Sequence, residues 1–165
     1  MAGSHTPIAG QEQPGLEDSL SFIKSKVANY GQVTNSPDKG FEASYVSFEG
    51  CTMKLFRRSA AKDCGLDSYS TVELVELDES RISVIPITKA DEWFRILLST
   101  RNNTNQIRFR SKCSVGGSIP EISETRSLLN IDLDNENVAY RVASAFRHAI
   151  KLCKRIEPFA RKAGA

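Results

Sequence analysis

A change of hydrophobic period along the chain constrains the fold more than any other feature. Near the start, five apolar residues recur at helical spacing, and they are Leu16, Leu20, Ile23, Val27 and Tyr30. Such spacing places them on one face of a helix. Between residues 41 and 133 apolar and polar residues alternate instead, which is typical of half-buried strands. Helical spacing returns after residue 135, so the sequence predicts an α+β domain, mainly β, between two amphipathic helices.

The two predicted helices divide the chain into a domain and two tails. Residues 1–15 hold three glycines and two prolines among polar neighbours, which predicts a flexible N-terminal tail. A helix over 16–30 follows, and we expect Gly31 to end it in a left-handed backbone conformation. The C-terminal helix is predicted over 135–155, with Asp134 as its cap and Pro158 closing it. A single domain over 16–157 and a C-terminal tail over 158–165 result.

Seven strands are predicted between the helices, in hairpin order. Their ranges are 41–48, 51–58, 71–77, 81–87, 93–100, 106–112 and 127–133. The pair Glu49-Gly50 is typical of a tight turn, and polar turn residues also separate the third from the fourth strand and the fifth from the sixth. Residues 59–69 and 113–125 are predicted loops. The pattern therefore indicates three successive hairpins followed by one more strand.

Length and charge exclude several classes of protein. The chain has 165 residues, and 22 basic against 20 acidic side chains give a formal charge of +2. A chain of this length normally folds as one domain, and a net charge this small does not indicate a partner. No apolar run approaches the roughly 20 residues that a membrane-spanning helix needs, which excludes an integral membrane protein.

The four cysteines, Cys51, Cys64, Cys113 and Cys153, show no local pairing. None stands in a C-x-x-C motif, so neither a zinc site nor a redox site is indicated. The segment Met1–Pro7 lacks the basic start and apolar stretch of a secretory signal. We therefore expect a cytoplasmic protein in which all four cysteines are reduced, buried thiols.

The layout of strands and closing helix resembles the pleckstrin-homology-like barrel. That resemblance implies seven antiparallel strands in two nearly orthogonal sheets, capped by the C-terminal helix, here with an extra N-terminal helix. The capping stripe would be Val138, Val142, Phe146 and Ile150. The stretch 136–153 also resembles the closing helix of small bacterial proteins of unassigned function. Because this superfold hosts lipid-binding, peptide-binding and structural domains, the resemblance implies a binding or scaffold role.

Catalytic motifs are absent from the sequence. There is no G-x-S-x-G nucleophile, no phosphate-binding glycine loop and no H-E-x-x-H metal motif. Of the two histidines, His5 lies in the predicted tail and His148 on the polar side of the last helix, where a solvated surface role is the simplest interpretation. We therefore expect a non-enzymatic protein without cofactor or metal.

A basic segment between residues 95 and 112 holds five cations and no acid. Period two places Arg108, Arg110 and Lys112 on one strand face, with Arg101 at the tip of the predicted hairpin. These four residues form a candidate anion site, and weak peripheral binding to anionic lipid headgroups is the alternative function. An ordinary solvent-exposed strand face explains the pattern more simply. Nucleic acid is disfavoured as a partner because stacking needs exposed aromatics, and Phe109 is expected to point inward.

The main functional expectation is a protein or peptide partner. Members of the resembled superfold often capture an extended peptide between the fifth strand and the C-terminal helix, by strand addition. The resemblance implies a groove lined here by Trp93, Arg95, Leu97, Arg141, Ser144 and His148. Trp93, the single tryptophan, suits either an interface anchor or a core position.

Overall fold

The computed structural model describes residues 14–36, 40–61, 64–87, 93–113 and 120–163. In these residues it contains nine strands and two α-helices, which confirms an α+β chain that is mainly β. The elements are α1 (Leu16–Tyr30), β1 (Gln32–Ser36), β2 (Gly40–Glu49), β3 (Thr52–Ala61), β4 (Cys64–Glu73), β5 (Ser83–Pro86), β6 (Phe94–Ser99), β7 (Ile107–Cys113), β8 (Ile122–Arg126), β9 (Leu128–Leu133) and α2 (Glu136–Ala163). Most of the predicted N-terminal tail, residues 1–13, lies outside the described residues.

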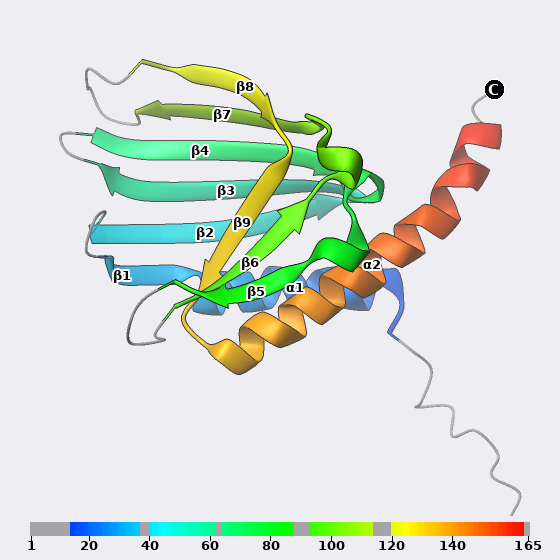
Figure 1. The fold of residues 1–165 in the computed structure, drawn as a ribbon, viewed down its shortest axis with the longest axis horizontal. Helices are drawn as coiled ribbons and strands as arrows, with labels where there is room; N and C mark the ends of the chain where they lie inside the picture. The colour runs from blue at the N-terminus through cyan, green and yellow to red at the C-terminus, as the bar shows by residue number, and fades with distance from the viewer. Residues whose placement is uncertain (1–13, 37–39, 62–63, 88–92, 114–119, 164–165) are drawn as a thin grey trace, which may run out of the picture.

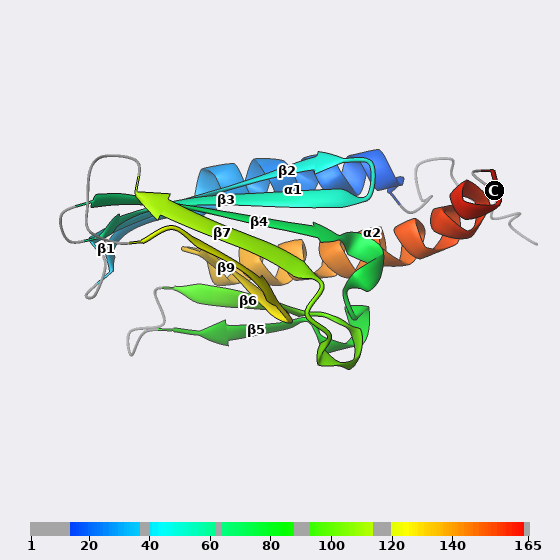
Figure 2. The same ribbon diagram turned by 90° about the horizontal axis from the view of Figure 1, so that it is seen from above.

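Two antiparallel sheets make up the β structure. The larger has six strands in the order β1-β2-β3-β4-β7-β8, and the smaller has three in the order β5-β6-β9. The smaller sheet crosses the larger one diagonally (Figure 1), and seen from above the two stand apart as separate layers (Figure 2). Neither sheet closes on itself across the described strands. The predicted seven-stranded barrel is therefore wrong, because β1 and β8 remain open edges.

The strand partners differ from the predicted hairpins. We expected 71–77 to pair with 81–87 and 93–100 with 106–112, but β4 and β7 pair with each other in the larger sheet. The strands β5 and β6 pair in the smaller sheet, where β6 also pairs with β9. Alternation fixes which side of a strand is buried, but it does not specify which neighbour the strand hydrogen-bonds.

Two strands and part of a third were missed in the sequence. In β8, inside the predicted loop 113–125, every residue is exposed, so no apolar alternation marks it. The first half of β4 lies inside the predicted loop 59–69, and β1 follows directly after the first helix. Each of these segments pairs with a neighbouring strand through backbone hydrogen bonds: β1 with β2, β4 with β3, and β8 with β7.

The helix α1 has the predicted bounds, Leu16–Tyr30, and buries Leu20, Ile23 and Val27. It ends at Gly31, but the backbone there, with φ −89°, is not left-handed as expected. Glycine is needed for space instead. An added Cβ would lie 2.4 Å from the carbonyl oxygen of Val27 and 3.2 Å from that of Ser44, on β2. The chain therefore turns from α1 into the sheet through a close backbone approach.

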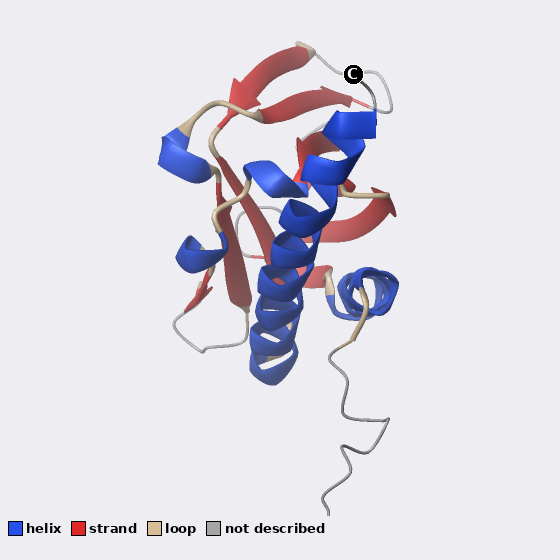
Figure 3. Cartoon of the chain, turned by 90° about the vertical axis from the view of Figure 1, so that its right-hand side faces the viewer, coloured by secondary structure: helices blue, strands red, loops and turns tan. Residues whose placement is uncertain are grey.

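The helix α2 lies between α1 and the smaller sheet (Figure 2), and α1 is seen end-on beside it in Figure 3. The predicted stripe Val142, Phe146 and Ile150 is fully buried in the core. Asn135 caps the helix, since its side-chain oxygen accepts from the backbone N–H of Val138, so the prediction of Asp134 as cap is wrong by one residue. The helix also continues past Pro158 to Ala163, and Pro158 does not end it.

A buried ion pair connects the two sheets. The Nε atom of Arg57 on β3 lies 2.8 Å from Oε1 of Glu42 on β2, whose side chain is only 8% exposed. Arg57 also donates to the carbonyl oxygen of Asn130 on β9. A buried charge needs both its counter-ion and further hydrogen bonds. Arg57 has its counter-ion on β2 of the larger sheet and a carbonyl acceptor on β9 of the smaller one.

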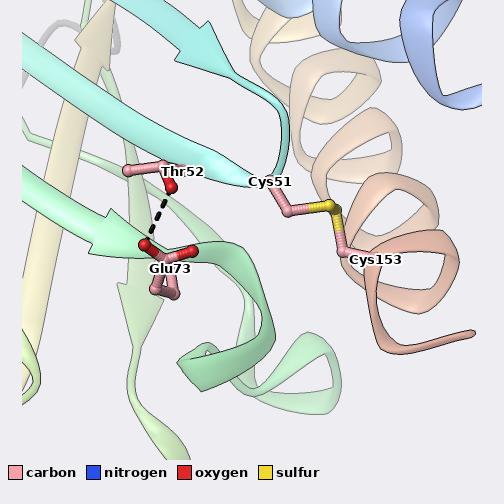
Figure 4. Close-up of a disulfide and its surroundings, with 4 residues drawn as sticks. All are labelled: Cys51, Thr52, Glu73 and Cys153. Atoms are coloured by element: carbon pink, nitrogen blue, oxygen red, sulfur yellow. Dashed lines mark hydrogen bonds between the residues drawn. A yellow bond between two sulfur atoms is a disulfide. The ribbon is translucent and has the colours of Figure 1, made fainter. Parts of the chain in front are cut away.

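All four cysteines are paired, so the prediction of free thiols is wrong. Cys51, in the turn between β2 and β3, bonds to Cys153 on α2 (Figure 4). Cys64 at the start of β4 bonds to Cys113 at the end of β7. The two cysteines of the first bridge are 102 residues apart in sequence, and those of the second are 49 apart. The pairing therefore follows from the tertiary fold and has no local signature in the sequence. Beside the first bridge, Thr52 donates to Glu73 at 2.8 Å, which ties the ends of β3 and β4 together (Figure 4).

The ion pair between Lys154 and Glu79 should make the free energy of unfolding depend on pH. Lys154 on α2 donates to Glu79, and this hydrogen bond holds the pKa of Glu79 below its usual value. A carboxylate whose pKa is lowered by folding stabilises the protein above its unfolded pKa, and this stability is lost as the pH falls. We expect Glu79→Gln to cost up to about 1 kcal/mol at neutral pH. The difference from wild type should shrink in urea denaturation as the pH falls below about 4.3, the ordinary pKa of a glutamate.

The matched control for this prediction is Glu49→Gln. Glu49 is exposed and makes no ion pair with the described residues, so its substitution should change the unfolding free energy little at either pH. Equal destabilisation by Glu79→Gln at neutral and acidic pH would contradict a contribution from the charge pair.

Candidate binding face on the six-stranded sheet

The larger sheet has one side in the core and one side turned outward. Alternation directs Val46, Leu55 and Val72 into the core, and their neighbours along each strand to the opposite side. The strand register arranges that opposite side, called here the outer face, in three rows across the strands. They are Tyr45–Phe56–Tyr69–Arg110–Ser123, Ser47–Lys54–Thr71–Arg108–Thr125, and Ala43–Arg58–Asp67–Lys112. The helices and the smaller sheet pack on the core side, which leaves most of the outer face open.

The first row begins with three aromatic rings on adjacent strands. The ring centroids of Tyr45 and Phe56 are 6.3 Å apart with a 27° angle between planes, and those of Phe56 and Tyr69 are 5.2 Å apart. Tyr45 is 42% exposed and Tyr69 40% exposed. Rings in such contact support one another, and together they present aromatic surface to solvent.

The rows on either side carry cations, most of them without a partner. Lys54, Arg108 and Lys112 are exposed and make no hydrogen bond or ion pair with any other residue in the described ranges. Arg110 lies 3.5 Å from Glu121, with both side chains more than half exposed. An exposed pair of this kind contributes little and opens easily, so four cations on this face remain available to an anion.

The fifth cation of the outer face is engaged. Arg58 donates two hydrogen bonds to Asp67, at 2.8 and 3.3 Å, and these bonds raise the pKa of the guanidinium. Asp67 is almost fully buried beneath it. The carboxylate is therefore neutralised by its neighbour and does not offset the charge of the other cations.

Two adjoining hollows cover the middle of the outer face. The larger, about 780 Å³, is lined by Lys54, Tyr69, Thr71, Arg108, Phe109, Arg110, Lys112, Ser123, Glu124 and Thr125. The smaller, about 410 Å³, lies over the aromatic row and shares Lys54, Tyr69 and Thr71 with the first. The two form one shallow, open depression that runs across the strands, and an extended ligand suits this shape better than a small enclosed one.

The structure brings together three of the four predicted anion-binding residues. Arg108, Arg110 and Lys112 share the outer face of β7, as the alternation predicted. Arg101 lies in the short helix Arg101–Asn103, 3.9 Å from Glu76. Arg95, from the same basic segment, belongs to the smaller sheet. It donates two hydrogen bonds to Asp132, which raise the pKa of its guanidinium.

The six residues of the predicted peptide groove are not brought together. Arg95 and Leu97 alternate on β6 with the buried Phe94, Ile96 and Leu98, so they lie on the opposite face of the strand from the core. The three groove residues on α2 line a separate hollow of about 750 Å³ between α1 and α2. They are Arg141, Ser144 and His148, and Phe22 and Tyr140 line the same hollow. Trp93 is half-buried just before β6, where its carbonyl accepts from the N–H of Ile87.

The aromatic row was missed because its members come from three strands. Each ring occupies an ordinary outward position in its own strand, and Tyr69 lay in a predicted loop. Within β7 the aromatic residue beside the arginines is Phe109, so this strand taken alone does not reveal the row. Alternation places the Phe109 side chain on the other side of β7 from Arg108 and Arg110, although Phe109 still lines part of the larger hollow. The guanidinium of Arg126 lies 3.4 Å from the centroid of its ring. Only the register of β2, β3 and β4 places the rings next to the cations.

No protein-family model, curated protein or solved structure matches the chain. Among the described residues, no group of three or more histidine, cysteine or acidic side chains is placed to hold a metal ion. None of the described helices is long and apolar enough to cross a membrane.

Proposed function

We propose that the protein is a non-enzymatic binding domain that holds an extended polyanion on the outer face of its larger sheet. The observation that supports this most strongly is the set of four available cations, Lys54, Arg108, Arg110 and Lys112, on an open surface with no free acid among them. Like charges held this close repel one another, and an anion that neutralises them relieves the repulsion. The pleckstrin-homology-like resemblance adds only its general implication of a binding role.

The outer face is a better candidate than the peptide groove expected from the sequence. The groove residues lie on two separate surfaces, and Arg95 already has a counter-ion in Asp132. On the outer face, by contrast, the cations come from two strands of one sheet, β3 and β7, with β4 between them, so the backbone ladder fixes the positions from which they extend. The strands that carry these cations are therefore already in place before a ligand binds.

The disulfides favour an oxidising compartment over the cytoplasm as the place of function. Both bridges join segments that are distant in sequence, and the reducing cytosol keeps such cysteines in the thiol form. One of them lies in the larger sheet, where Cys64 and Cys113 tie the start of β4 to the end of β7. We therefore propose that the domain works at a cell surface, in a periplasm or outside the cell.

Charge removal on β7 tests the proposed function. Each Lys or Arg near an anionic surface contributes about 1 kcal/mol, so the triple variant Arg108→Gln/Arg110→Gln/Lys112→Gln should bind a polyanion about a hundredfold more weakly. The probe is fluorescently labelled oligogalacturonate, followed by anisotropy at low and at physiological salt. Binding by the wild type should weaken as salt rises.

A second triple variant serves as the matched control. It has the same net charge as the first variant but loses its three cations at positions away from the outer face. Lys24→Gln/Lys151→Gln/Arg155→Gln removes three exposed cations from the two helices, and its affinity should stay within about threefold of wild type. Equal losses in both variants would indicate non-specific attraction to net charge and contradict the proposal. Tighter binding to vesicles of anionic lipid than to oligogalacturonate would also contradict it, in favour of lipid headgroups.

A further inference from the structure

We infer that the polyanion is an anionic polysaccharide, whose sugar rings lie on the aromatic row while its acidic groups contact the flanking cations. This inference rests on the proposed function and adds the chemical class of the ligand. It starts from a feature that charge does not explain, namely the exposed rings of Tyr45 and Tyr69 in the centre of a basic surface. A polyanion without rings would gain nothing from packing against these two side chains.

The geometry fits a chain of rings laid across the strands. The aromatic row crosses β2, β3 and β4 and continues on β7 as Arg110, directly opposite Tyr69. The neighbouring rows lie two residues away along each strand. Lys54 and Arg108 belong to the row on one side of the aromatic row, and Lys112 belongs to the row on the other side. A polymer following the rings therefore has cations on both sides and a cation at the end of its path.

The side chains around the rings suit sugar chemistry. The C–H groups on one face of a sugar ring are weakly positive, and they pack against the negative π face of an aromatic ring. Serine and threonine hydroxyls stand beside the cations at Ser47, Thr71, Ser123 and Thr125, where they can exchange hydrogen bonds with sugar hydroxyls. Carboxylate, sulfate or phosphate groups on the sugars would then meet the lysines and arginines.

The disulfides separate this ligand from single-stranded nucleic acid, which also combines rings with negative charge. The Cys64–Cys113 bridge closes the end of the two strands that carry Tyr69 and Arg110, so the binding face is built with a bond that persists in oxidising surroundings. The ring-bearing polyanions of cell surfaces and extracellular matrices are acidic polysaccharides. Nucleic acid is concentrated in the reducing interior of the cell, where this bridge would open.

The experiment compares three probes of equal charge on the full chain with its disulfides intact. They are oligogalacturonate, polyphosphate and oligothymidylate, each measured by anisotropy at the same salt concentration. We expect oligogalacturonate to bind most tightly. Tyr45→Ala and Tyr69→Ala should each weaken it about threefold to tenfold and leave polyphosphate unchanged. Tyr45→Phe and Tyr69→Phe keep the ring and should keep the affinity for oligogalacturonate.

The outcomes distinguish this inference from the proposed function. Equal affinity for polyphosphate and oligogalacturonate, with no effect of either tyrosine variant, would overturn the polysaccharide inference while the polyanion proposal stands. Tighter, ring-dependent binding of oligothymidylate would also overturn it, in favour of nucleic acid. Failure of all three probes to bind would overturn both. The two tyrosines are part-exposed, so unchanged melting temperatures should show that the alanine variants still fold.

Discussion

Replacing both Cys51 and Cys153 by serine should lower the free energy of unfolding by about 4–5 kcal/mol. The bridge closes a loop of about a hundred residues, and in the chain-entropy account a longer loop restricts the unfolded state more. It also ties the β2–β3 turn to α2, and Cys153 is fully buried. The urea midpoint of the oxidised wild type and of the double variant, fitted with a common slope, measures the loss.

The second bridge provides the comparison for this prediction. Cys64 and Cys113 are 49 residues apart, so the corresponding double variant should lose about 0.6 kcal/mol less than the first. Mass spectrometry of protein refolded under air should give the mass of two disulfides. Four titratable thiols in that protein, or an unchanged urea midpoint after removal of Cys51 and Cys153, would contradict the pairing.

Phe146→Ala should destabilise the protein by about 3–5 kcal/mol. Phe146 is fully buried in the middle of α2, where the helix packs between α1 and the smaller sheet, so truncation leaves a cavity that rigid strands and helices cannot fill. Urea denaturation measures the effect. Tyr140→Ala, on the same helix but 52% exposed, is the matched control and should change stability by less than about 0.5 kcal/mol. Similar losses in both variants would contradict the central position of Phe146.

Elements defined by local pattern were predictable from the sequence. The bounds of α1 follow from its apolar stripe, and the hairpin of β2 and β3 follows from alternation around Gly50, whose φ of +59° suits glycine. The buried stripe of α2 was predictable for the same reason. In each case residues close in sequence determine both the element and its buried face.

Features that depend on distant residues were not predictable. The strands β5 and β6 pair in the smaller sheet and contact α2, whereas β7 pairs with β4 in the larger sheet, and the sequence of each strand alone does not indicate these partners. The cysteine pairs and the aromatic row share this property, because each joins residues from different elements. For the candidate binding face, the cations of β7 were therefore predictable from the sequence, but the rings beside them and the Cys64–Cys113 bridge were not.

The location of ligand contacts on the protein tests the central claim most directly. Oligogalacturonate should be titrated into ¹⁵N-labelled protein while the backbone amide chemical shifts are followed. The largest changes should fall on β3, β4 and β7 around Lys54, Tyr69 and Arg110, with α1 and α2 unaffected. Changes concentrated instead around Phe22 and His148, in the hollow between the two helices, would contradict the outer face as the binding surface.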